Sequence, residues 1–366
     1  MHDAHKPFRT TRREWALIDP NNDVFKPHHA FKAGVNFVVW ATSPADERYR
    51  SWRKELLAPF YTLDNWTWAE ALNVAVNAWG FALNDPRIRL MHAAFINYGP
   101  TVQICKEVAL GSFGKFIEEL QNEIQGITKA SQISGNFMPA PRETHRWCLV
   151  YPSKDRFPMA RVISDYVEDL LVARLMMLDA SENYELYSLS DSFSEVSNLQ
   201  DRIFEQVMHA NLPDSRYTIF PMPRVDKEEH YVDLTGVSYR PFQNLDSLSR
   251  DVRQGVYWIP QARSLQGVHS LAIVKDAVYI FQVTRNVKQA ISHTSLESIR
   301  DDLPLHLQSV DRWEFVWVVP HDKSYAFTNP YPIEDAGAAT WHLHLRQFIM
   351  PVVVNSDLFY RAFLAR

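Results

Sequence analysis

Glycine and cysteine are scarce in this sequence, and long apolar runs are absent. Its 366 residues include 11 glycines and only two cysteines, Cys105 and Cys148. Two cysteines are too few for a disulfide framework or a cysteine zinc site, and they fit a reducing compartment. No apolar run approaches the ~20 residues that span a bilayer, and the polar N-terminus lacks the apolar core of a signal peptide. We therefore expect an intracellular protein, nuclear or cytoplasmic, with no membrane partner.

The nucleotide-binding pattern GxxxxGK[ST] is also missing. That loop supplies the backbone N–H groups and the lysine that hold the β and γ phosphates of a nucleotide. Its absence argues against ATP hydrolysis by this chain.

The charge balance gives no general attraction to nucleic acid. There are 38 Lys and Arg against 43 Asp and Glu, a net charge of −5, so contact with nucleic acid would need a local basic patch. A hydrophobic content of 46% with 22% charged residues is typical of a soluble globular protein. The length allows two or three domains.

Two short apolar runs near the N-terminus end in polar side chains. Residues 15–19 read WALID, and residues 35–41 are followed by Thr42 and Ser43. Buried strands of this kind are typical of a parallel α/β sheet with its ligand site at the carboxyl ends. Asp19, Thr42 and Ser43 are thus candidate nucleotide contacts, although a strand ending in Asp-Pro is more often a turn.

Helical patterns dominate residues 45–127. Thr67 and Glu70 have the spacing of a capping box, and Pro86 suits the first turn of another helix. Later in the chain we expect a short strand at residues 147–151 and a helix over residues 160–180.

A further helix is expected over residues 195–210, where apolar side chains recur on one face. Glu205 lies beside this face, and His209 follows four residues later. Without further information this pair reads as a solvated helical contact worth a few tenths of a kcal/mol.

The stretch from residue 255 to residue 296 predicts a strand, a turn, a second strand and a helix. Its centre, residues 278–284, is an apolar run ending on polar side chains. Thr294, with a glutamate three residues on, predicts a helix cap, and Pro304 limits the length of that helix. Residues 313–320 predict a buried strand, which makes the region mixed α/β.

The chain resembles the C-terminal part of the Crinkler and retrotransposon-hot-spot proteins, which pair a P-loop ATPase with a nuclease-like domain. The segments that carry the resemblance are residues 39–44, 66–70, 98–101, 204–205, 257–260, 282–284 and 317–320. The resemblance implies an α/β fold in which a partial P-loop-type piece with a helical lid precedes a restriction-endonuclease-like domain of mixed sheet. It implies four parts: a sheet remnant (1–44), a lid (45–130), a connecting helical region (131–190) and the nuclease-like domain (191–366).

The resemblance also implies a site. Phosphodiester cleavage needs carboxylates around Mg²⁺. Glu205 would be the helix acid and a metal ligand, His269 stands where the family carries its aspartate, and Gln282 and Thr284 fall on the (E/Q)x(K/T) element. Gln289 stands where relatives often carry a histidine. Histidine is a poor Mg²⁺ ligand, and Thr284 cannot act as a lysine.

We therefore expect a non-catalytic or weakly active nuclease-like protein that binds nucleic acid or a protein partner. One alternative is a metal-dependent nuclease acting on DNA or RNA, with Mg²⁺ as its cofactor, and another is a fragment with no ligand. Asp276 could supply a carboxylate, although aspartate is common in hairpin turns. Residues that could contact a phosphate backbone are Arg285, Lys288, Arg300 and Trp258, although a solvated face is the commoner meaning of such scatter.

Overall fold

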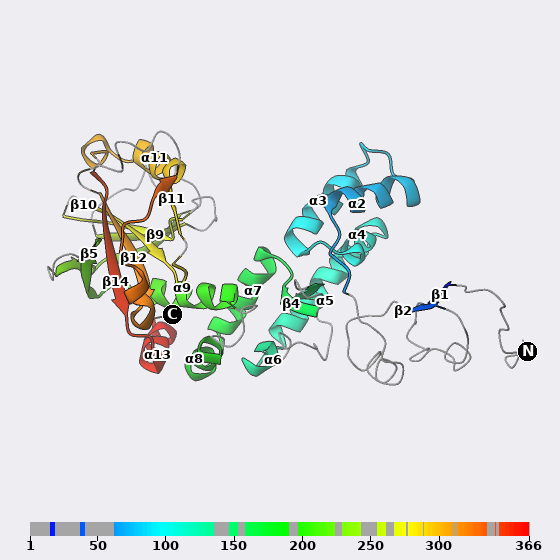
Figure 1. Ribbon diagram of the computed structural model, residues 1–366, viewed down its shortest axis with the longest axis horizontal. Helices are drawn as coiled ribbons and strands as arrows, with labels where there is room; N and C mark the ends of the chain where they lie inside the picture. Colours follow the sequence, from blue (N-terminus) through cyan, green and yellow to red (C-terminus); the bar gives the residue numbers. More distant parts are fainter. Residues whose placement is uncertain are drawn as a thin grey trace, which may run out of the picture. The chain divides into compact units, whose positions relative to one another are not determined.

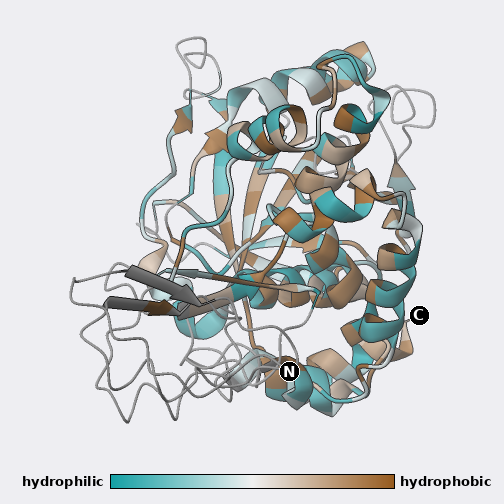
Figure 2. Ribbon diagram, turned by 90° about the vertical axis from the view of Figure 1, so that its right-hand side faces the viewer, coloured by the Kyte–Doolittle hydropathy of each residue, from teal (hydrophilic) through white to brown (hydrophobic). Residues whose placement is uncertain are grey.

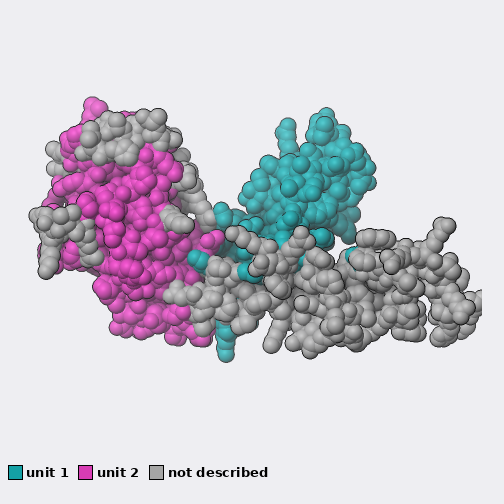
Figure 3. Space-filling model, in the orientation of Figure 1, with its two compact units in different colours: residues 1–178, 189–197 teal, residues 179–188, 198–366 magenta. Residues whose placement is uncertain are grey.

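The computed structural model shows a mixed α/β protein (Figure 1). It describes residues 15–18, 37–40, 62–134, 146–152, 158–189, 197–223, 229–242, 255–260, 267–275, 277–287, 289–309, 311, 313–334, 341 and 344–365. Two compact units are present, one of residues 1–178 and 189–197 and one of residues 179–188 and 198–366 (Figure 3). Among the helices of these described ranges, none combines the length and apolarity needed to cross a membrane.

The first unit begins with the two predicted strands. β1 (Trp15–Ile18) and β2 (Phe37–Trp40) pair in parallel, with Trp15 opposite Phe37 and Ile18 opposite Trp40. The candidate nucleotide contacts Asp19, Thr42 and Ser43 lie outside the described residues, so they stay predictions.

The helices of the first unit begin where the sequence places caps. In the capping box, the Thr67 N–H donates to Glu70 Oε2 at 2.8 Å and the Glu70 N–H donates to Thr67 Oγ1 at 3.3 Å. Asp85 caps the helix that begins at Pro86 by accepting a hydrogen bond from the backbone N–H of Arg87. The elements are α2 (Trp68–Asn73), the π-helix η2 (Val74–Ala78), α3 (Pro86–Tyr98), α4 (Val102–Ala109), α5 (Phe113–Gln125), α6 (Ser131–Ser134) and α7 (Asp165–Met176).

The helix predicted over residues 160–180 is wrong at both ends. Residues Pro158–Val162 form β4, which pairs antiparallel with β3 (Cys148–Pro152). Ser164 then caps α7, and a separate helix, α8 (Ala180–Leu189), begins in the second unit. Short apolar runs fit a strand or a helix equally well, and here the pairing with β3 decides.

The second unit is built on an eight-stranded mixed sheet with the order β6-β5-β14-β12-β10-β9-β8-β7. β8, β9 and β10 are successively antiparallel, whereas β10, β12 and β14 run parallel. The strands are β5 (Arg216–Pro221), β6 (His230–Asp233), β7 (Ser238–Phe242), β8 (Val256–Pro260), β9 (Ser270–Val274), β10 (Ala277–Val283), β12 (Trp313–Pro320) and β14 (Arg346–Val352). β7 is an edge strand that the sequence hides, because it is largely exposed and contains a proline.

Smaller elements complete this unit. Two short strands, β11 (Ile291–Ser292) and β13 (Ile333–Glu334), pair in parallel. The helices are α9 (Ser197–Asn211), α11 (His293–Asp302), the 3₁₀ turns η5 (Leu305–Leu307) and η7 (His321–Ala326), and α13 (Ser356–Leu364).

The core of the second unit surrounds the parallel strands. Every residue of β12 is buried, as expected for a parallel strand covered on both faces. Phe315 and Trp317 from one face of this strand belong to the same apolar cluster as Leu296 and Ile299 of α11. The central strands are coloured mainly as hydrophobic in Figure 2.

The N-cap of α11 lies two residues before the predicted cap. Ser292 is the N-cap and accepts a hydrogen bond from the Ser295 N–H at 3.2 Å, so the Thr294 cap is wrong. The pairing of Ser292 in β11 holds it in the extended conformation that a cap needs. The helix ends at Asp302, so the stop expected before Pro304 is confirmed.

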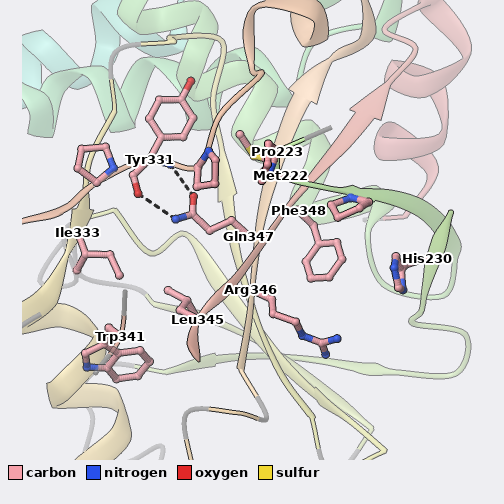
Figure 4. Close-up of a pocket in the computed structure, with 13 residues that line it drawn as sticks. Met222, Pro223, His230, Tyr331, Ile333, Trp341, Leu345, Arg346, Gln347 and Phe348 are labelled. Atoms are coloured by element: carbon pink, nitrogen blue, oxygen red, sulfur yellow. Dashed lines mark hydrogen bonds between the residues drawn. The ribbon is translucent and has the colours of Figure 1, made fainter. Parts of the chain in front are cut away.

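A buried glutamine fastens the segment around Tyr331 to the sheet. Gln347 of β14 is 8% exposed; its Oε1 accepts from the Tyr331 N–H at 2.9 Å and from Trp317 Nε1 at 3.2 Å. Its Nε2 donates to the Tyr331 carbonyl at 2.9 Å (Figure 4). All polar atoms of this amide therefore have partners, and the segment that leads into β13 is fixed in place.

Replacing Gln347 by leucine is expected to lower the free energy of unfolding by about 2–3 kcal/mol, because the buried Trp317 indole N–H loses its acceptor. Chemical denaturation of the full chain measures this. Gln206→Leu, at an exposed position of α9, is the matched control and should change stability by less than about 0.5 kcal/mol. Equal effects of the two substitutions would contradict the role of Gln347.

Candidate functional site

A cavity of about 350 Å³ lies at the carboxyl end of β10. All four predicted catalytic residues, Glu205, His269, Gln282 and Thr284, line it. The other lining residues are Asp201, Arg202, Gly267, Val283, Gln289, Ala290, Ser292 and Glu334. Side chains from α9, β10, β13 and the segment before β9 therefore meet at one sheet edge.

α9 presents its two acids to the cavity because of its packing. Ile203, Phe204 and Val207 are fully buried and fix the rotation of the helix. Asp201 and Glu205, four residues apart, then share a helix face. Asp201 was not among the predicted site residues. Its spacing of four residues from Glu205 is the sequence signal that could have identified it.

The Glu205 carboxylate is surrounded by basic side chains. Its Oε2 pairs with Arg202 Nη1 at 2.5 Å, while its Oε1 lies 3.6 Å from His209 Nε2 and 3.7 Å from His269 Nδ1. Burial favours the neutral acid, but the neighbouring His269, His209 and Arg202 side chains outweigh it and hold the Glu205 pKa well below its usual range. Glu205 is therefore ionised at every physiological pH.

The pair of Glu205 and His209 is not a solvated surface contact. His209 is 4% exposed, and its Nδ1 shares a 2.9 Å hydrogen bond with the Tyr257 hydroxyl. That hydroxyl shares another, of 2.6 Å, with Ser270 Oγ. Burial raises the pKa of Tyr257 well above its usual value, so the hydroxyl stays protonated. This buried chain orients His209 toward Glu205.

The end of β10 carries a second polar chain, built from side-chain amides. Gln282 Nε2 donates to Gln289 Oε1 at 3.1 Å, and Gln289 Nε2 donates to Thr284 Oγ1 at 3.2 Å. The Asn286 N–H also donates to Thr284 Oγ1, at 3.0 Å. Gln282 Oε1 is buried and accepts no hydrogen bond from the residues that the structure describes.

Asp201 is an acid in an unfavourable place. Burial raises its pKa to about 6, against the opposing charges of Arg285 and Lys323. Arg285 Nη1 lies 4.0 Å from the carboxylate, and the guanidinium covers the ring of Tyr187 at 4.9 Å. Glu334 was not among the predicted site residues, and no local pattern marks it. It lines the cavity because β13 pairs with β11, which places Glu334 opposite Ser292.

The Mg²⁺ ion implied by the family resemblance does not fit these side chains. In the described part of the chain, no group of three or more His, Cys, Asp or Glu side chains is arranged to hold a metal ion. Both oxygens of Glu205 face basic groups, and His269 offers nitrogen to an ion that prefers oxygen.

Among the described residues, Trp258 and Arg300 do not line the cavity. Asp276 and Lys288 lie outside the described residues. Trp258 is 2% exposed, so it cannot stack on a nucleic acid from the surface. Arg300 pairs with Glu297 on α11.

No family model, curated protein or solved structure matches this chain.

Replacing Asp201 by asparagine should remove a pH-dependent loss of stability. Because the folded-state pKa is raised, the folded protein holds this proton more tightly than the unfolded chain. The resulting stability is complete below about pH 4 and is lost as the pH rises through about 6. The side chain is 31% exposed, so after solvent screening the expected loss is about 1–2 kcal/mol.

Urea denaturation of both proteins at pH 4.5 and 7.5 measures this effect. The unfolding free energy of Asp201→Asn minus that of the parent should be higher at pH 7.5 than at pH 4.5. The same difference in unfolding free energy at both values would show that Asp201 does not titrate in this range.

Proposed function

We propose that residues 191–366 form a restriction-endonuclease-like domain that binds nucleic acid and does not hydrolyse it with a metal ion. The observation that carries this proposal is the surrounding of the Glu205 carboxylate by Arg202, His209 and His269. The resemblance to Crinkler and retrotransposon-hot-spot proteins supplies the nuclease-like ancestry.

The order of elements supports that ancestry. After α9 with its acid, the chain forms β5, β6 and β7, then the antiparallel strands β8, β9 and β10, and then α11 and the parallel strand β12. A nuclease of this type carries a helix acid, a strand acid and an (E/Q)xK element. The resemblance assigns Glu205, His269 and Gln282 to these three positions, and all three line one cavity.

The charges explain why metal-dependent cleavage is not expected. In a metal site, carboxylates face a divalent cation. Here a histidine stands in the place of the strand acid, and Glu205 already has Arg202, His209 and His269 within 4 Å. The Arg202 guanidinium would repel a divalent cation placed beside it. Thr284, in the position of the lysine, is held by the amide chain and carries no charge.

Arg202 offers a contact for a phosphate backbone at the cavity. Its side chain is 22% exposed and lines the cavity. Phosphate contacts of this kind supply affinity without base specificity.

One observation favours metal-dependent nuclease activity as a second candidate. Asp201 and Glu334 line the same cavity as Glu205, so three carboxylates are present at one sheet edge. This candidate predicts cleavage of DNA or RNA that needs Mg²⁺ or Mn²⁺.

Binding of fluorescent single-stranded and duplex oligonucleotides in EDTA tests the proposal. We expect binding that weakens with salt, and Arg202→Gln should lower the salt dependence by about one counterion. Arg361→Gln, at an exposed position of α13, is the control and should leave affinity unchanged. Absence of binding to all oligonucleotides would overturn the proposal.

The same oligonucleotides with Mg²⁺ or Mn²⁺ separate the two candidates. The proposal predicts intact strands after prolonged incubation. Divalent-dependent cleavage that disappears in Glu205→Gln would establish the second candidate instead.

A further inference from the structure

The amide chain in the cavity runs in one direction. Thr284 Oγ1 accepts from the Asn286 N–H at 3.0 Å and lies 3.4 Å from the Asn286 carbonyl. Gln289 presents its NH₂ group to Thr284 Oγ1, at 3.2 Å. Its amide oxygen is then left to face Gln282.

The orientation of Gln282 follows from that of Gln289. Gln282 must offer its NH₂ group to Gln289 Oε1, which leaves its own Oε1 as an acceptor without a donor. The residue is 4% exposed and lines the cavity. Buried polar atoms of folded proteins normally have partners. An oriented acceptor without one at a cavity wall indicates that a ligand supplies the hydrogen-bond donor.

Gly267 keeps the approach to this acceptor open. A Cβ atom at this position would lie 3.5 Å from Gln282 Oε1 and 3.7 Å from the Ala290 carbonyl. Its φ of +77° also favours glycine. Any larger side chain would occupy the space in front of the Gln282 carbonyl.

The rest of the wall is also rich in acceptors. Asp201 Oδ1 is buried and accepts no hydrogen bond, and Glu334 lines the cavity nearby. These acceptors attract N–H donors. The cavity, of about 350 Å³, is at the lower end of the range for small-molecule sites and suits a single nucleobase. A strand would then keep its phosphates outside and insert a base.

We propose that the cavity receives an unpaired cytosine or adenine, whose amino group at position 4 or 6 donates to Gln282 Oε1. This inference rests on the proposed nucleic-acid binding. Uracil and hypoxanthine carry a carbonyl at the same position, which would face the Gln282 carbonyl and be disfavoured. A base can enter a cavity of this size only when it is unpaired and unstacked, so single strands are the ligand class.

Two matched pairs of single-stranded RNA test the inference. Oligocytidylate and oligouridylate differ at the amino or carbonyl group of position 4, and adenosine and inosine differ likewise at position 6. The parent protein should bind the amino member of each pair about tenfold more tightly. This comparison needs no variant, so its result does not depend on how a substitution folds.

Substitutions at Gln282 test whether this residue causes the preference for cytosine over uracil. Gln282→Met keeps the volume and removes the acceptor, so the cytosine-to-uracil ratio should fall to about one. Gln282→Glu keeps an acceptor and should retain the preference for cytosine. Gln206→Met, on the exposed face of α9, is the control and should leave the ratio unchanged.

Two results would overturn the inference while leaving nucleic-acid binding intact. One is equal affinity of the parent for both members of each pair. The other is an unchanged cytosine preference in a folded Gln282→Met protein. Failure of the parent to bind any strand would instead overturn the proposed function and the inference together.

Discussion

A buried carboxylate needs positive charge beside it, and Glu205 is the carboxylate around which this site is built. Burial alone would leave it neutral, or would push it to the surface. Arg202 from the same helix supplies a positive charge, and the imidazoles of His209, one turn on, and of His269, before β9, lie within 4 Å of the carboxylate. The Tyr257 and Ser270 hydroxyls, from β8 and β9, keep His209 in position. The helix acid therefore ties α9 to two strands of the sheet.

The parallel strands hold the other half of the site. β10, β12 and β14 are paired along their length, so the end of β10 is fixed and Gln282 and Thr284 have defined places. The amide chain from Gln282 through Gln289 to Thr284 then uses every hydrogen-bonding group except one oxygen. Charge on one wall and amides on the other leave a cavity whose chemistry favours hydrogen-bond donors over metal ions.

Much of the framework could be predicted because local patterns dominate there. The Thr67 and Glu70 capping box, the stop before Pro304 and the buried strand β12 all follow from short-range rules. The convergence of Glu205, His269, Gln282 and Thr284 was also expected, through the family resemblance. Their roles remain a proposal.

Other features depend on contacts between distant segments and could not be read from spacing. β4 is a strand because β3 lies beside it, and Ser292 rather than Thr294 caps α11 because β11 pairs with β13. Glu334 reaches the cavity through that same pairing. His209 was predicted to be solvated because its own helix contains no sign of its buried partner, the Tyr257 hydroxyl, which lies far away in the sequence.

The most direct test asks whether basic side chains have taken the place of a divalent cation at Glu205. Titration of Mn²⁺ into the full chain, followed by electron paramagnetic resonance, counts bound ions without relying on any activity. The parent and Glu205→Gln should show the same binding, and His269→Asp should gain one additional site. One Mn²⁺ bound by the parent and lost in Glu205→Gln would contradict the replacement of metal by protein charge.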